Sequence, residues 1–220
     1  MKKLKTKGLD MTLYVLRHGQ TPWNKLKKLQ GRMDIPLNEN GLELAAKTGE
    51  AMLEVPIDLV ISSPLKRARQ TAELITVGRN IPMIIDERIE EISFGDYEGE
   101  SVLDGESEVI PADFLHKFYN KPLKCNRPPH GESFQDVIER TKDFYKSLIE
   151  NPEYKDKNIL ISSHGAASRC FLCNFYTDKE DVWRGQIPPN CSVTIVDVND
   201  DGQGRVRVLD KQFAKLDDKK

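Results

Sequence analysis

The sequence predicts an α/β fold: a three-layer α/β/α sandwich with a mostly parallel central sheet. Short apolar runs of strand length alternate along the chain with longer segments in which apolar residues repeat at helical spacing. Such an alternation produces a largely parallel sheet with helices on both faces. The length of 220 residues fits one ordinary domain, and 38% apolar with 31% charged residues is typical of a globular protein.

The predicted elements follow one another in a regular order. We expect strands at 12–17, 58–63, 82–86 and 158–163, and a closing pair at 191–198 and 205–209 around the turn-forming sequence NDDGQG. We expect helices at 41–53, 65–77 and 134–149, and one more helix directly after the strand at 158–163.

The remaining segments divide the chain. Residues 1–10 (MKKLKTKGLD) are charged and lack the apolar stretch of a secretory signal, so we expect a flexible tail. The domain is expected to span 11–212, followed by a second flexible tail at 213–220. Within it, 100–130 is polar and contains prolines, and we expect an insertion, or lid, over one end of the sheet. No apolar run approaches membrane-spanning length, so a cytoplasmic location without membrane contact is expected.

Charge and cysteine content exclude other classes. The formal net charge of −2 does not suit a globally basic nucleic-acid-binding protein. Cys170 and Cys173 form a CxxC, but a structural zinc site would need a second such pair. We therefore expect buried free thiols on one helix face and no metal site. Oligomeric state is not predicted.

Chemistry-bearing residues gather where three predicted strands end. These ends read LRHGQT (16–21), SSPLKRARQTA (62–72) and SSHGAASR (162–169). In a parallel sheet, ligands bind beyond the carboxyl ends of the strands. Gly19 and Gly165 let the backbone turn sharply there, so that N–H groups and helix N-termini can approach an anion.

The charges at these ends suit a phosphoryl group. Arg17 and Arg67 supply fixed positive charge in a planar fork that matches phosphate oxygens. Phosphoryl transfer depends mostly on positioning and charge neutralisation, and a neutral histidine can supply the attacking atom. From spacing alone, either His18 or His164 could be the nucleophile.

Six sequence blocks together resemble one family. LRHGQTPWN (16–24) and QGRMDIPLNENG (30–41) are followed, in order, by SSPLKRARQTA, EISFGDYEG (91–99), GES (131–133) and SSHG (162–165). These blocks are similar to the signature of the histidine phosphatase superfamily, the phosphoglycerate mutase-like proteins. The resemblance extends from residue 12 to about 198, and it also implies the phosphoglycerate mutase-like form of the sandwich.

The resemblance assigns roles to individual residues. It implies that His18 becomes phosphohistidine, that Glu91 donates a proton to the leaving group, and that His164 stabilises charge in the transition state. It places the phosphate and substrate contacts at Arg17, Arg67, Asn24, Gln30, Gly19 and Gly165. No cofactor is implied, and the partner is a small phosphorylated molecule. Several carboxyl groups lie close to Glu91 in the sequence, and only the resemblance separates it from them.

Three functions are compatible with these residues. A phosphomonoester hydrolase acting on small metabolites is favoured, because EISFGDYEG differs from the ERHYG block of cofactor-dependent mutases and 100–108 is acidic. A cofactor-dependent phosphoglycerate mutase is the alternative. A non-enzymatic phosphate-binding domain is remote, because the nucleophile and the charges of the phosphate pocket are all present. Trp23 and Trp183 are interpreted as packing residues.

Overall fold

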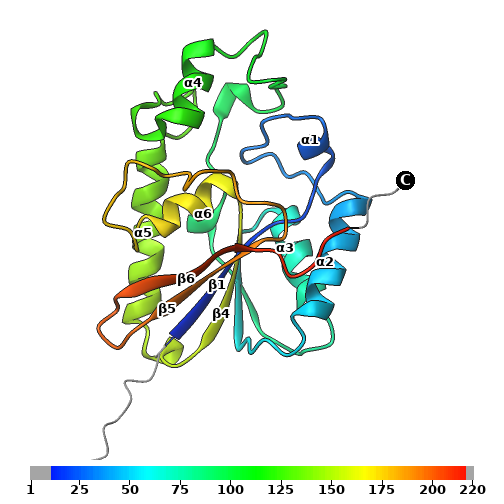
Figure 1. Cartoon of the computed structure of the whole chain (residues 1–220), viewed down its shortest axis with the longest axis vertical. Helices are drawn as coiled ribbons and strands as arrows, with labels where there is room; N and C mark the ends of the chain where they lie inside the picture. The colour runs from blue at the N-terminus through cyan, green and yellow to red at the C-terminus, as the bar shows by residue number, and fades with distance from the viewer. Residues whose placement is uncertain (1–10, 217–220) are drawn as a thin grey trace, which may run out of the picture.

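The computed structural model describes residues 11–216, so the predicted tail at 1–10 and the last four residues of the tail at 213–220 lie outside the described residues. The sheet has six strands in the order β3-β2-β4-β1-β5-β6 (Figure 1). Their bounds are Met11–Arg17 (β1), Leu59–Ser62 (β2), Met83–Ile85 (β3), Asn158–Ser163 (β4), Val193–Val198 (β5) and Gly204–Lys211 (β6).

The sheet is mostly parallel. β1 pairs in parallel with β4, β4 with β2, and β2 with β3, whereas β5 is antiparallel to β1 and β6 to β5. In the β1–β4 register, Arg17 lies opposite Ser163. The two His-Gly pairs that follow these strands therefore leave the sheet side by side, as predicted.

The helices are Pro22–Lys25 (α1), Glu39–Ala51 (α2), Lys66–Ile75 (α3), Ala112–Asn120 (α4), Phe134–Glu150 (α5) and Gly165–Leu172 (α6). Four short 3₁₀ turns lie at 87–89, 95–97, 122–124 and 152–154. Every predicted strand and helix is present, with ends shifted by at most two residues. This confirms the predicted α/β class.

Alternate residues of the central strands pack on opposite faces of the sheet. Leu13 and Ile161 belong to one apolar cluster with Phe144 of α5 and Phe171 of α6. Neighbouring strand residues, such as Leu16 and Leu160, instead pack with Met52, Ala72 and Ile75 from the α2 and α3 side. Figure 1 shows α5 and α6 on one side of the sheet and α2 and α3 on the other. The three layers are therefore helices, sheet and helices.

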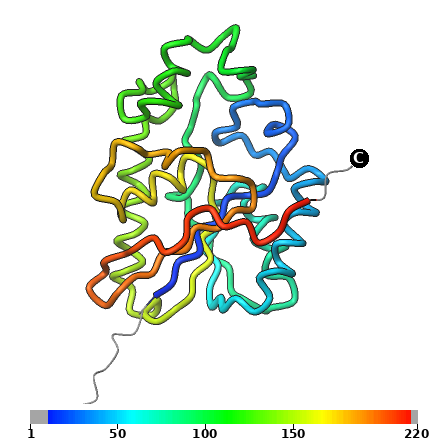
Figure 2. The backbone as a smooth tube through the Cα atoms, viewed as in Figure 1, coloured from blue at the N-terminus to red at the C-terminus, as the bar shows by residue number. Residues whose placement is uncertain are grey.

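The segment 100–130 packs over one end of the sheet and shares an apolar core with α5 and α6. Figure 2 shows this green segment at one end of the molecule, beyond the carboxyl ends of the parallel strands. Phe114, Leu115 and Phe118 of α4 are buried, and Phe118 packs against Phe134 at the start of α5. No helix was predicted within 100–130, because a nine-residue helix with three buried apolar side chains is easily hidden in polar sequence.

Three further expectations can be compared with the described residues. The four cysteines are free, and Cys170 and Cys173 are buried, as predicted. Phe213 packs against the core cluster beside α2 and α3, so the packed part extends one residue beyond the predicted boundary. Among residues 11–216, no helix combines the length and the apolarity needed to cross a bilayer.

Candidate active site

A cavity of about 260 Å³ opens beyond the carboxyl ends of the central strands. Seven of the nine predicted site residues line it: Arg17, His18, Asn24, Gln30, Arg67, Glu91 and Gly165. These seven come from four separate parts of the chain, so the fold brings together what the sequence keeps apart. His164 and Gly19 do not line the cavity, but the residues next to them in sequence, Gly165 and His18, do.

The His18 ring is fixed in one tautomer. It is 2% exposed, and its Nδ1 lies 2.7 Å from the carbonyl oxygen of Gly19. Because a carbonyl only accepts hydrogen bonds, Nδ1 carries the proton and Nε2 keeps its lone pair. Burial, and after it the charges of Arg67 and Arg17, lower the pKa of His18 well below 6.5. At neutral pH the ring is therefore uncharged, with a free lone pair on Nε2.

This assignment predicts an unusual titration. A lowered pKa means that the neutral ring persists as pH falls through 6.5 and becomes charged only at a much lower pH. His130 provides an internal comparison, since its hydrogen bond to Asp96 raises its pKa. At pH 6.5, ¹⁵N imidazole spectra are expected to show His18 neutral with the proton on Nδ1 and His130 mostly charged. If His18 titrates at or above 6.5, the assignment is wrong.

Arg67 is held rigidly beneath the cavity. It lies in the first turn of α3 and donates to the carbonyls of Met33 (2.7 Å) and Gly31 (2.6 Å), and its Nε to Nδ1 of His164 (3.2 Å). Burial lowers the pKa of Arg67 to about 10, so the guanidinium remains charged at neutral pH. It therefore provides a fixed, pre-oriented cation.

His164 lies behind this arginine. Its ring is fully buried, with the ring centroid 5.2 Å from that of His18. Nδ1 accepts from Arg67, and Nε2 lies 2.8 Å from Oγ of Ser63 and is positioned to donate to it. Both nitrogens are thus in use. Charge stabilisation by His164 in the transition state stays a prediction, and the contacts of its ring are with Arg67, Ser63 and the ring of His18.

Arg17, at the end of β1, has an unused donor. Its Nη1 donates to the carbonyl of Pro188, but its Nε is buried without a hydrogen-bond partner among residues 11–216. Leaving a buried charged donor unpaired is costly, so an anion at this position would be favoured. Burial lowers the pKa of the Arg17 guanidinium below its usual range.

Asn24 and Gln30 present donors to the cavity. Thr21 caps α1, and Oδ1 of Asn24 accepts from the Thr21 N–H (3.1 Å) and hydroxyl (3.2 Å). The Thr21 hydroxyl has a single proton, which it shares with Oε1 of Gln30 at 2.9 Å. With their oxygens engaged, the two side-chain NH₂ groups are the polar ends left for a phosphate.

Gly19 leaves room for the backbone where its loop meets α2, as expected. A Cβ there would lie 2.8 Å from the carbonyl oxygen of Gly41 in α2, so the close approach of loop and helix requires glycine. Its N–H donates to Oγ1 of Thr71 (2.9 Å) and does not face an anion. Gly19 therefore shapes the loop that carries His18.

Glu91 lies at the N-terminus of α6. Its Oε1 accepts from the N–H groups of Ile92 and Ala167, both at 3.0 Å, and its Oε2 accepts one longer bond of 3.3 Å from Ala166. We expected this helix end to face phosphate, but its first-turn N–H groups hold the carboxylate instead. The less engaged oxygen, Oε2, is the one available to a substrate.

The backbone around Glu91 is positioned by Arg140 of α5, a residue that sequence reasoning missed. Arg140 donates to the carbonyls of Arg88 (2.7 Å), Glu90 (2.8 Å) and Glu91 (3.0 Å). Its charge is balanced by Glu132, which also accepts from the N–H of Ser93. Glu132 lies in the GES block, which was therefore the sequence feature that could have indicated a partner for Arg140. Arg140 thereby fixes a segment that has no strand or long helix of its own.

The described residues, 11–216, contain no group of three or more His, Cys, Asp or Glu side chains that could hold a metal ion.

Known proteins resemble this chain over nearly its whole length. The sequence profile of the histidine phosphatase superfamily (branch 1) matches residues 13–211. A Bacillus subtilis protein named uncharacterized phosphatase PhoE is 34% identical over 158 residues, 72% of this chain and 74% of that protein. An Escherichia fergusonii protein named probable phosphoglycerate mutase GpmB is 30% identical over 187 residues, 85% of each chain.

Solved structures agree with the sequence comparison. Bacillus stearothermophilus YhfR superposes with a TM-score of 0.83 at 31% identity, covering 93% of this chain and all of that one. This chain belongs to the histidine phosphatase superfamily, branch 1.

Proposed function

We propose that this chain is a phosphomonoester hydrolase that acts on small phosphorylated metabolites through a phosphohistidine on Nε2 of His18. The observation that carries the proposal is the state of the His18 ring. Its Nδ1 donates a hydrogen bond to the carbonyl of Gly19, which leaves the lone pair of Nε2 free. The ring lines a cavity that Arg17 and Arg67 also line. That combination supplies a nucleophile and charge neutralisation at one point.

In the first half-reaction, Nε2 of His18 forms a bond to phosphorus as the bond from phosphorus to the ester oxygen breaks. Arg17 and Arg67 neutralise the phosphoryl oxygens, and the NH₂ groups of Asn24 and Gln30 can donate to them. An alkoxide is a poor leaving group, so a protonated Glu91 gives its proton to the departing oxygen and the alcohol leaves.

In the second half-reaction, water attacks phosphorus and the bond to Nε2 breaks. The Glu91 carboxylate takes one proton from that water, inorganic phosphate leaves, and the His18 lone pair is restored. Glu91 thus returns to its protonated state for the next turnover. All charge neutralisation in this scheme comes from arginine side chains, and we propose that no metal is needed.

A phosphoglycerate mutase is the second candidate, since a relative bearing that name is 30% identical over 85% of the chain. The surface beside the cavity mouth argues for hydrolysis. Glu100, Glu106 and Glu108 line a neighbouring hollow that shares Lys28 with the cavity. These carboxylates would repel a bisphosphorylated intermediate more strongly than a monoester.

One experiment separates these functions. The protein is incubated with 3-phosphoglycerate, with and without 2,3-bisphosphoglycerate, in the presence of a chelator, and followed by ³¹P NMR. We expect any turnover of 3-phosphoglycerate to release inorganic phosphate without isomerisation, and 4-nitrophenyl phosphate to give an acid-labile phosphoenzyme on rapid quenching. Isomerisation faster than phosphate release would indicate a mutase, and absence of both reactions and of any phosphoenzyme with 4-nitrophenyl phosphate would refute catalysis.

A further inference from the structure

The cavity has an apolar wall as well as its charged groups. Its apolar lining residues are Leu29, Phe94, Val102, Phe118, Trp183 and Ile187. All except Ile187 are buried. Trp183, interpreted from sequence as a packing residue, does pack edge-on against Phe118 and Phe134, and it also lines this wall.

Acceptors around this wall are already engaged. The carbonyl of Phe118 accepts from the Trp183 indole (2.7 Å), that of Gly31 accepts from Arg67, and that of Lys27 accepts from the Val102 N–H (2.8 Å). The side-chain oxygens of Asn24 and Gln30 accept from Thr21, as described above.

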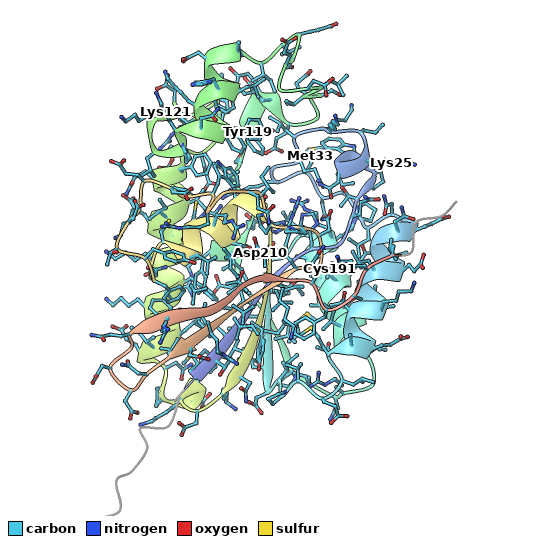
Figure 3. All side chains as sticks on the ribbon, viewed as in Figure 1. Lys25, Met33, Tyr119, Lys121, Cys191 and Asp210 are labelled. Atoms are coloured by element: carbon cyan, nitrogen blue, oxygen red, sulfur yellow. The ribbon has the colours of Figure 1, made fainter. Side chains whose placement is uncertain are left out.

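The remaining polar groups of the cavity are mostly donors. Lys27 and Lys28 contribute ammonium groups, which donate and cannot accept. Glu91 is the one carboxylate among the described residues that line the cavity, and its oxygens hold α6 and the leaving group. Tyr119, at the end of α4 in the upper part of Figure 3, contributes a hydroxyl from a side chain that is more exposed than the wall.

We propose, on the basis of the hydrolase function above, that the substrates are monophosphates of compact apolar alcohols and phenols, and that hydroxyl-rich leaving groups are selected against. Each hydroxyl carries a proton that needs an acceptor. A hydroxyl buried against this apolar wall would lose its hydrogen bond to water without gaining another. An apolar ring or chain would instead gain from burial against the same aromatic side chains.

Cavity size adds a limit. The interior of about 260 Å³ has to hold the phosphoryl group as well as part of the leaving group. A leaving group of roughly one six-membered ring is therefore the size that the wall can cover, and a larger group would extend into solvent. Substrate selection thus follows from an apolar wall of limited depth.

A matched pair of substrates tests this inference. Cyclohexylmethyl phosphate and glucose 6-phosphate are both primary esters on a six-membered ring, but only the second carries ring hydroxyls. We expect kcat/KM for cyclohexylmethyl phosphate to be higher by about 100-fold or more, because hydroxyls facing an apolar wall are rejected at roughly this level. 4-Nitrophenyl phosphate serves as the activated reference.

Substitutions of wall residues test whether the preference for the apolar ester arises from the wall. Val102→Asn, which adds an acceptor to the wall, is expected to reduce the kcat/KM ratio about tenfold. Ile187→Gln makes the same change at a half-open position on a loop, and it serves if Val102→Asn does not fold. Leu103→Asn, next in sequence but exposed and outside the cavity, is expected to leave the ratio and the activity unchanged.

The outcomes are distinguishable. Equal or better hydrolysis of glucose 6-phosphate would overturn the inference and leave the hydrolase proposal standing. A preference for the apolar ester that neither wall variant changes would also overturn it, because the preference would then arise elsewhere. Failure to hydrolyse any of the three esters would overturn the proposed function itself.

Discussion

His18→Ala is expected to lower kcat by roughly 10⁴-fold or more and to remove the phosphoenzyme, because removing a catalytic nucleophile costs about this much in covalent catalysis. The variant keeps Arg17 and Arg67, so substrate binding is expected to change far less than turnover. Rapid quench with a ³²P-labelled monoester measures the covalent intermediate, and steady-state phosphate release measures kcat.

The control for this variant is His116→Ala, which removes an exposed histidine of α4 that does not line the cavity. Wild-type rates are expected for it. If the His18 variant still formed a stoichiometric phosphoenzyme, the nucleophile would have to be another residue, and the proposed mechanism would be wrong.

Glu91→Gln is expected to give the second largest loss, and one that depends on the leaving group. The amide oxygen of glutamine can keep the two bonds that Oε1 accepts from Ile92 and Ala167, so the segment should stay in place. The NH₂ group that replaces Oε2 cannot deliver a carboxylic proton. For alkyl phosphates we expect kcat/KM to fall about 10²- to 10⁴-fold, the usual contribution of a general acid.

4-Nitrophenyl phosphate, whose leaving group needs little protonation, is expected to lose less than about tenfold in kcat/KM with Glu91→Gln. The matched control is Asp96→Asn, since Asp96 lies in the same block but pairs with exposed His130 and does not line the cavity. Equal losses for alkyl and aryl esters would show that Glu91 does not act as the acid.

The order of the elements and the position of the site were predictable because both depend on local sequence. Apolar runs ending in His-Gly or Ser-Ser place polar groups at strand ends, and parallel pairing brings those ends to one edge. His18, Arg17 and Arg67 could be identified in this way. Once the family resemblance was recognised, Glu91, Asn24 and Gln30 followed, and all six line the cavity.

Other parts of the site were not predictable because they depend on contacts between distant segments. The helix end that follows His164 binds Glu91, 75 residues away, and nothing in either segment alone indicates that pairing. Likewise, α4 is short, and its apolar side chains become a wall only when they meet Trp183. The hydrogen bond that Arg67 donates to His164 also joins segments far apart in the sequence, so it could not be predicted from either segment.

The three carbonyls held by Arg140 have a consequence for how such a protein can diverge. The position of the Glu91 backbone is determined by the guanidinium of Arg140, 49 residues further along the chain, together with the Glu132 carboxylate that neutralises it. A drifting lineage could not replace either partner singly without displacing the acid. Positions 91, 132 and 140 should therefore be inherited as one unit, while the apolar wall beside them is free to adapt to new metabolites.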